Sequence, residues 1–195
     1  MAHCGMKFRN AVIAAVTALL PLIAGAQQSV AEFASGESEK LDWRIVDDGV
    51  MGGLSNGKCE IGKDGMLRFF GTLSLENNGG FSSLRTGNVN MDLSGADGVV
   101  LRVKGDGRTY QLRFGTDAEH RGREVSFQAG FQTTKGEWTE AKVPFTRFTG
   151  SWRGIRLPDK AFNPAKIRRL GLQLADKKAG PFELQVDWIR IYKGP

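Results

Sequence analysis

The residues most able to bind a ligand or to react gather in two glycine-rich stretches of the chain. The first, residues 43–55, contains the adjacent carboxylates Asp47 and Asp48, and the second, residues 76–85, contains an acid, two amides and an arginine. Glycine tolerates positive φ and close approach of other groups, so such clusters predict sharply turned but ordered loops. Neither stretch pairs a nucleophile with a base or gathers a set of metal ligands. Together they predict a shaped binding surface rather than a reaction centre.

The two adjacent carboxylates have two interpretations. On a strand, Asp47 and Asp48 would point to opposite faces, which suits a shared general acid–base pair poorly. Turn chemistry, in which each carboxylate accepts hydrogen bonds from local backbone N–H groups, is the favoured interpretation. A Ca²⁺ site built from one carboxylate and loop carbonyls is the alternative.

A third motif, at residues 52–58, matches the G-x-x-x-x-G-K part of a phosphate-binding loop. Such a loop needs a hydroxyl residue next, for Mg²⁺, and then a helix. Cys59 occupies the hydroxyl position, and the residues after it form no helical pattern. The sequence therefore predicts no nucleotide site.

Catalytic candidates are few. His120 lies in a charged turn, and no G-x-S-x-G motif accompanies it, so a solvated histidine is favoured over a hydrolase that uses it. Cys59 has only Lys58 beside it to lower its pKa, which predicts an inert or buried thiol. We expect a protein that is not an enzyme and holds neither cofactor nor metal.

Strand-borne polar residues supply further binding candidates. Arg85, Arg113 and Gln128 lie out of phase with neighbouring apolar residues, so they should face away from the core. Trp152 and Arg153 follow in a turn-rich segment, and Trp and Arg dominate binding hot spots. The competing interpretations are an ordinary solvated sheet face and a Trp that covers one end of the barrel. The complete set of predicted binding residues is Asp47, Asp48, Met51, Ser55, Glu76, Asn77, Asn78, Phe81, Arg85, Arg113, Gln128, Trp152 and Arg153.

Short alternating runs must position these residues. Apolar and polar residues alternate with period 2 between clusters of Gly, Asp and Asn, which is typical of an antiparallel sandwich. The runs cover residues 66–70, 98–103, 109–114, 124–131, 139–145, 169–174 and 182–192. Residues 104–108 predict a hairpin turn through their Asp-Gly, residues 135–138 a second turn, and residues 163–169 one helical turn after Pro164. The expected fold is an all-β, antiparallel, jelly-roll-like β-sandwich with little helix.

The N-terminus predicts a targeting segment. Lys7 and Arg9 precede an apolar run over residues 11–23, and Ala24-Gly25-Ala26 fits a small-x-small cleavage site. We therefore expect a signal peptide over residues 1–26, a flexible tether over 27–40, and one sandwich domain over 41–195. This pattern predicts an exported protein, periplasmic or secreted.

The charge pattern limits the class of partner. The formal net charge is +6, and basic and acidic residues are interspersed along the chain. A nucleic-acid-binding protein usually carries a basic stripe or arm, which this sequence lacks. We expect no nucleic-acid partner.

Several ordered motifs carry a family resemblance. They are D-D-G-V-M-G-G-L-S at 47–55, F-x-G-x-L-S-L-E-N-N-G-G-F-S-S-L-R at 69–85, V-K-G-D-G-R-x-Y at 103–110, F-Q-A-G-F-Q-T at 127–133, V-P-F at 143–145 and D-W-I at 187–189. With them the chain from Leu41 to Tyr192 resembles the complex I intermediate-associated protein 30 family. The resemblance implies a galactose-binding-like β-sandwich and no catalytic residues. Mitochondrial members of the family are chaperones for the assembly of respiratory complex I, in a compartment that does not correspond to export.

These observations lead to one function and one alternative. We expect a non-catalytic assembly, chaperone-like or scaffolding factor that binds a protein partner of an envelope or respiratory membrane complex. The alternative is a carbohydrate-binding module for an envelope glycan. Rigid loops with a few aromatic and arginine anchors would serve either role.

Overall fold

The protein is an antiparallel β-sandwich. The computed structural model describes residues 29–34 and 41–194. Alternating runs separated by glycine-rich turns become strands because one face of each run can then be buried against the facing sheet. The strands are β1 (Ser29–Glu32), β2 (Arg44–Asp47), β3 (Asn56–Ile61), β4 (Leu67–Leu73), β5 (Ser82–Arg85), β6 (Gly98–Lys104), β7 (Thr109–His120), β8 (Arg123–Gln132), β9 (Trp138–Pro144), β10 (Thr149–Trp152), β11 (Ile155–Leu157), β12 (Arg169–Leu174) and β13 (Gly180–Tyr192).

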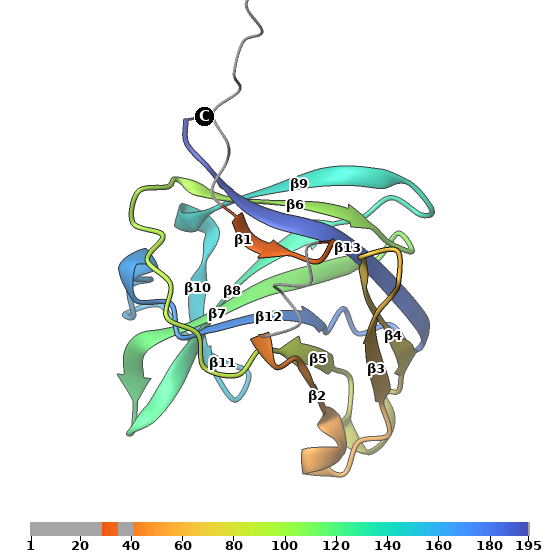
Figure 1. Cartoon of the computed structure of the whole chain (residues 1–195). Helices are drawn as coiled ribbons and strands as arrows, with labels where there is room; N and C mark the ends of the chain where they lie inside the picture. The colour runs from red at the N-terminus through yellow and green to blue at the C-terminus, as the bar shows by residue number, and fades with distance from the viewer. Residues whose placement is uncertain (1–28, 35–40, 195) are drawn as a thin grey trace, which may run out of the picture.

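The strands form two facing sheets (Figure 1). The six-stranded sheet has the order β3-β4-β13-β6-β9, with β1 added along β13. The seven-stranded sheet has the order β11-β10-β8-β7-β12-β5-β2. In Figure 1, β9, β6 and β13 lie above β8, β7 and β12. The predicted fold class is confirmed.

The core lies between the sheets and follows the alternation of the strands. On β7, Leu112 and Phe114 are fully buried, and on β8 Phe127 is fully buried. Between them, Arg113 and Gln128 are half-buried and occupy the opposite face. The same pattern that builds the core therefore sets a row of polar side chains on the outer face of the seven-stranded sheet.

Helix is confined to short 3-10 turns within the described ranges. These are η2 (Asp48–Met51), η3 (Glu76–Asn78), η4 (Phe145–Arg147) and η5 (Pro164–Lys166). The helical turn predicted after Pro164 is confirmed as η5, where the Asn163 side chain accepts a hydrogen bond from the Ala165 N–H. Across residues 29–34 and 41–194, no helix has the length and apolar character needed to cross a membrane.

The hairpin predicted at residues 104–108 is wrong. The strands on its two sides, β6 and β7, belong to different sheets, so this turn carries the chain from one sheet to the other. Asp106 sets the crossing, because its carboxylate accepts hydrogen bonds from the Tyr110 hydroxyl (3.0 Å) and the Glu183 N–H (3.0 Å). The Asp-Gly pair does form a turn. The hydrogen bonds of Asp106 to Tyr110 and Glu183, however, direct the following strand β7 into the other sheet instead of back alongside β6.

The tether predicted over residues 27–40 contains a strand. Residues Ser29–Glu32 form β1, which pairs with β13, and Val30, Ala31 and Phe33 are buried in the core. A four-residue strand beside polar residues gives too short an alternation to be recognised from the sequence. The predicted signal peptide, residues 1–26, lies outside the described residues.

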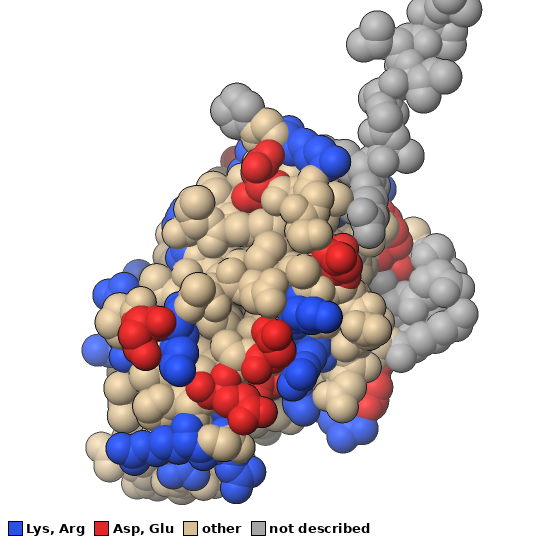
Figure 2. Space-filling model, turned by 90° about the vertical axis from the view of Figure 1, so that its left-hand side faces the viewer, with Lys and Arg blue, Asp and Glu red and all other residues tan. Residues whose placement is uncertain are grey.

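The surface charge is mixed on the end of the sandwich that Figure 2 shows. Lys and Arg side chains lie next to Asp and Glu side chains there, and neither sign forms a continuous field (Figure 2). This arrangement agrees with the interspersed charges of the sequence. A surface that attracts long polyanions would need a larger area of one sign.

Candidate functional site

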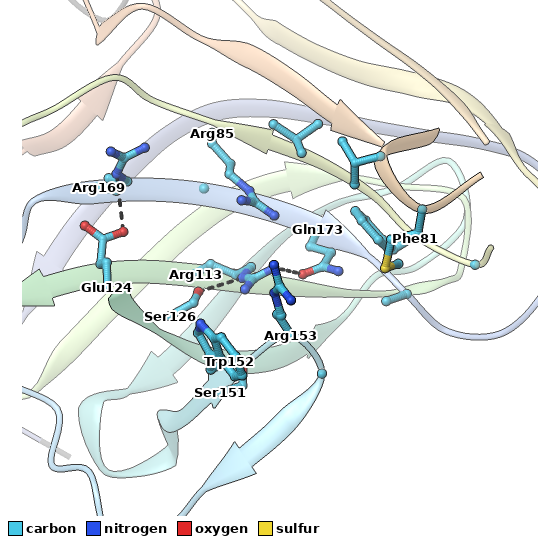
Figure 3. Close-up of a pocket in the computed structure, with 18 of the residues that line it drawn as sticks. Phe81, Arg85, Arg113, Glu124, Ser126, Ser151, Trp152, Arg153, Arg169 and Gln173 are labelled. Carbon is cyan, nitrogen blue, oxygen red and sulfur yellow. Dashed lines mark hydrogen bonds and ion pairs between the residues drawn. The ribbon is translucent and has the colours of Figure 1, made fainter. Parts of the chain in front are cut away.

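A groove of about 870 Å³ lies on the outer face of the seven-stranded sheet. Its floor comes from the central strands of the sheet, and its walls come from η2 with the loop after η3 on one side and the β10–β11 turn on the other (Figure 3). The lining residues, which define the groove from here on, are Val46, Val50, Met51, Leu75, Gly79, Gly80, Phe81, Arg85, Arg113, Gly115, Glu124, Ser126, Ser151, Trp152, Arg153, Gly154, Arg169, Leu170, Gly171, Gln173, Ala175 and Lys177.

Strand register places two arginines on either side of a glycine at the floor of the groove. Gly171 on β12 pairs with Arg85 on β5 and with Arg113 on β7. A side chain at Gly171 would bring its Cβ within 2.8 Å of the Leu84 carbonyl oxygen and 3.5 Å of Arg85 Cγ. Glycine at this position therefore keeps the space between the two arginine side chains open.

Arg113 is held by neutral partners. Its Nε donates a hydrogen bond of 2.9 Å to Ser126 Oγ, and its guanidinium also donates to Gln173 Oε1. Burial, together with the smaller effect of the nearby charge of Arg85, lowers the pKa of Arg113 to about 10. Within the part of the chain that the structure describes, no carboxylate pairs with this guanidinium.

The guanidinium of Arg85 has even fewer hydrogen-bond acceptors around it than that of Arg113. One terminal nitrogen donates to Ser83 Oγ at 3.2 Å, while the buried Nε has no hydrogen-bond partner among the described residues. Burial lowers the pKa of the Arg85 guanidinium, Arg169 adds to the effect, and Glu124 opposes it. A desolvated charge without a carboxylate partner is costly, so the groove floor is electrostatically unsatisfied.

The groove as a whole is positively charged. Arg153, Arg169 and Lys177 join the two floor arginines in its lining. Glu124 is the only carboxylate in that lining as described, and it pairs with Arg169 Nε at 3.3 Å. The Coulomb field in the groove therefore favours an anionic ligand.

Trp152 and Arg153 form one wall. β10 ends at Trp152, and Arg153 and Gly154 then adopt positive φ (49° and 80°) in a tight turn to Ile155, the strand partner of Trp152. The Arg153 guanidinium lies 5.2 Å from the centre of the Trp152 ring, and the His120 ring lies 5.4 Å from it. Figure 3 shows Arg153 reaching from this wall toward Arg113.

Asp48 holds the opposite wall together. It is fully buried, and its carboxylate accepts hydrogen bonds from Ser55 N–H (3.0 Å) and Oγ (2.6 Å), Gly80 N–H (2.7 Å) and Phe81 N–H (3.2 Å). Burial raises the pKa of Asp48, but these hydrogen bonds outweigh it and hold the pKa below its ordinary value. Asp48 thus joins the two glycine-rich loops of the sequence into one structure.

Asp47 has a similar structural role. Its carboxylate accepts hydrogen bonds from the Gly57 N–H (2.8 Å) and from Ser82 Oγ (2.6 Å). Every carboxylate oxygen of Asp47 and Asp48 accepts a hydrogen bond from the protein. The donors lie 7 to 35 residues further along the chain, so these are tertiary contacts and not the local turn hydrogen bonds expected from the sequence. Over the described ranges, no group of three or more His, Cys, Asp or Glu residues is placed to hold a metal ion.

Comparison with known proteins identifies the family. The sequence profile of the complex I intermediate-associated protein 30 family matches residues 31–186. The chain belongs to this family. It is 30% identical over 179 residues to the mouse protein named complex I intermediate-associated protein 30, mitochondrial, and 25% identical over 175 residues to its Drosophila melanogaster namesake. These alignments cover 82% and 78% of this chain but only 55% and 59% of the two relatives.

Solved structures support the fold of this family domain. A family 11 carbohydrate-binding module of Clostridium thermocellum is similar with a TM-score of 0.60 at 15% identity, and the match covers 79% of this chain and 89% of the module. The agarase AgWH50C is similar with a TM-score of 0.54 at 12% identity, covering 86% of this chain and 26% of the agarase. At these identities the likeness shows a shared β-sandwich and no more.

The comparison overturns the predicted location. We expected a periplasmic or secreted protein, but the relatives from mouse, Drosophila melanogaster, Caenorhabditis briggsae and Caenorhabditis elegans are all named as mitochondrial. The prediction of export relied on a composition pattern alone, basic residues followed by an apolar run, and this pattern gave the wrong compartment.

The structure separates the predicted binding residues into two groups. Six of them line the groove: Met51, Phe81, Arg85, Arg113, Trp152 and Arg153. The others lie outside its lining: Asp47, Asp48, Ser55, Glu76, Asn77, Asn78 and Gln128. In this second group, the Asn77 amide donates to the Gly52 carbonyl (3.2 Å) and Gln128 accepts from Ser151 Oγ (3.4 Å), so these side chains support the walls.

Sequence reasoning missed other lining residues. Arg169 and Gln173 flank Gly171 on β12, and Glu124 and Ser126 lie on β8. Alternation along the runs at 169–174 and 124–131 marked all four as outward-facing. Only the order of the strands shows that they share a groove with Arg85 and Arg113.

Proposed function

We propose that the protein is a non-catalytic binding factor that assists the assembly of a respiratory membrane complex, complex I, through its groove. The family match over residues 31–186 carries this proposal, because it spans nearly all of the sandwich. The names of the mouse and Drosophila melanogaster relatives link those proteins to complex I intermediates.

The groove suits protein binding because its walls are held in place before a partner arrives. Hydrogen bonds from Gly80 and Phe81 to Asp48 fix one wall, and the tight turn at Arg153 and Gly154 fixes the other. Preorganised loops reduce the entropy lost on association. Exposed apolar side chains at Val50 and Met51, 76% and 64% exposed, would become buried in such a complex.

The chemistry of the lining also suits binding. The described lining contains no His, Cys or Tyr; of its two serines, Ser126 accepts a hydrogen bond from Arg113 and Ser151 donates one to Gln128. Burial raises the pKa of the Cys59 thiol, which disfavours a thiolate nucleophile. The groove thus offers guanidinium groups, Met51 and Trp152, residue types that are enriched at protein interfaces.

The proposal is tested by removing the protein and then restoring it, while the amount of assembled complex I is measured. The gene is disrupted in its own organism, and complex I is followed on blue-native gels and by NADH:quinone oxidoreductase activity. We expect less assembled complex and an accumulated intermediate, both corrected by the intact chain. Normal amounts of assembled complex in the disrupted strain would reject the proposal.

Carbohydrate binding is the second candidate function. A related fold is described in complex with a β-1,3-1,4-mixed-linked tetrasaccharide, and here Trp152 stands on a groove wall where a sugar ring could stack. Titration with mixed-linkage gluco-oligosaccharides should then quench Trp fluorescence, and Trp152→Ala should remove the quench. Trp fluorescence that stays unchanged throughout the titration would reject carbohydrate binding.

A further inference from the structure

We infer that Arg85 and Arg113 form a carboxylate-recognition site above Gly171, and that its ligand is an acidic side chain on an extended peptide segment of the partner. This inference rests on the proposed function, in which the groove binds a protein. It adds the chemical class of the contact and the two residues that determine it.

Arg85 and Arg113 line the same groove on either side of Gly171. Arg85 and Arg113 lie one strand on either side of Gly171, so their Cα atoms are about 10 Å apart, two inter-strand spacings. Gly171 contributes no side chain to fill the space between them. In Figure 3 the guanidinium groups of Arg85, Arg113 and Arg153 point into the same part of the groove from three different strands or turns.

The electrostatics leave the same two groups in need of a counter-charge. The Arg85 Nε is buried and has no hydrogen-bond partner among the described residues, and the hydrogen bonds that Arg113 donates to described side chains go to the neutral Ser126 and Gln173. Other half-buried arginines of this protein are paired: Arg68 with Glu183 at 3.1 Å, and Arg190 with Glu32 at 2.6 Å. A carboxylate would supply the counter-charge that both guanidinium groups lack and form charge-assisted hydrogen bonds with their terminal nitrogens.

The rim of the groove favours a peptide as the carrier of that carboxylate. Val50, Met51 and Leu75 line the groove and are 76%, 64% and 44% exposed. Aliphatic rim side chains match apolar side chains that flank an acidic residue, and they do not match the hydroxyl groups of an acidic glycan. An anionic bilayer presents a flat surface, whereas Arg113 lies on the floor of a groove with walls on both sides.

The test compares capped short peptides that differ in one functional group. Each peptide carries a central Glu between Val, Leu or Phe residues, and its counterpart carries Gln at the same place. Isothermal titration calorimetry is performed on the folded full chain. We expect Glu peptides to bind about tenfold or more tightly than their Gln counterparts, and Arg85→Met or Arg113→Met to remove that preference.

Arg102→Met provides the matched control. Arg102 lies on β6 of the opposite sheet, and its Nε, like that of Arg85, is buried without a hydrogen-bond partner among the described residues, but it forms an ion pair with Asp187 at 3.1 Å. The substitution removes the same charge from the protein without touching the groove. We expect Arg102→Met to keep the full preference for Glu, which would exclude a general effect of net charge.

Several results would overturn the inference. These are equal binding of Glu and Gln peptides, an equal loss in Arg102→Met, and absence of binding across the whole peptide panel. Binding of oligoglucuronate or of phosphatidylserine-rich vesicles, lost in Arg113→Met while no peptide binds, would also reject a peptide ligand.

The inference and the proposed function can fail separately. If Arg85→Met and Arg113→Met restore complex I assembly in the disrupted strain as fully as the intact chain, the carboxylate site is rejected and the assembly role stands. If disruption has no effect on complex I while the Glu peptides bind as expected, the assembly role is rejected and the site stands.

Discussion

The carboxylate of Asp48 accepts a hydrogen bond of 2.7 Å from the backbone N–H of Gly80, which lies 32 residues later in the chain. The same carboxylate oxygen accepts a hydrogen bond of 2.6 Å from Ser55 Oγ. One buried side chain thus holds both loops of the groove wall, and a Cβ at Gly79 would approach it to 2.7 Å. The close approach of Asp48 therefore requires glycine at position 79.

Asp48→Asn should loosen this wall. The amide has the shape of the carboxylate but replaces one acceptor oxygen with a donor, so at least one of the Ser55, Gly80 and Phe81 N–H groups loses its hydrogen bond. We expect a loss of about 1–3 kcal/mol in the free energy of unfolding, measured by urea denaturation. Asp64→Asn is the control, because Asp64 lies in a turn and its hydrogen bond from a described residue is long, 3.3 Å from the Met66 N–H. Equal losses in the two variants would contradict this role of Asp48.

Stability should fall in acid. The pKa values of Asp48, Asp176 and Glu183 lie below their ordinary values in the folded protein. A carboxyl group whose pKa is lower in the folded than in the unfolded protein binds fewer protons in the folded state. Its contribution to the free energy of unfolding is therefore fully present above the unfolded pKa, near 4. That stabilisation is lost as pH falls from there through the folded pKa. The midpoint of urea unfolding, measured between neutral and acid pH, should decrease below about pH 4, and less steeply in Asp48→Asn. A midpoint that rises in acid would refute this assignment.

The same substitution should have opposite consequences at two arginines. Arg108 makes a bidentate ion pair with Asp176, Nε to Oδ2 at 2.9 Å and a terminal nitrogen to Oδ1 at 2.6 Å, and both side chains are nearly buried. Arg108→Met would leave the Asp176 carboxylate unpaired and should cost about 3 kcal/mol. Arg85→Met removes a largely buried charge that forms no ion pair with a carboxylate of the described residues, so it should leave stability unchanged or raise it by about 1 kcal/mol. Thermal denaturation of the two variants beside the unmodified protein measures both effects, and a large loss in Arg85→Met would show that Arg85 is structural.

Gly171→Ala should destabilise the protein because the added Cβ would clash with the adjacent strand. The added Cβ would lie 2.8 Å from the Leu84 carbonyl oxygen, which is a backbone atom of the adjacent strand and cannot move without shifting β5. We expect a loss of about 1–3 kcal/mol in unfolding free energy. Gly49→Ala is the matched control, because a Cβ there would have no atom within 4 Å. It should change stability by less than about 1 kcal/mol, and a comparable loss in both variants would remove the steric explanation.

The sequence by itself determined the all-β class and most of the long strands. The runs at 109–114 and 124–131 alternate so regularly that burial of one face was their only stable arrangement. The same alternation showed that Arg113 and Gln128 point away from the core. Strands such as β2, β5 and β10 were not predicted, because four residues among glycines and serines give too little alternation to recognise.

The tertiary structure decided which outward-facing residues act together. Arg85 and Arg113 lie 28 residues apart and come together only because β12, from much later in the chain, inserts between their strands. The order and register of strands depend on packing across the whole sandwich, which no local pattern encodes. The same applies to Asp48, which local rules assigned to turn chemistry, and which the folded chain uses to join two distant loops into the wall of the groove.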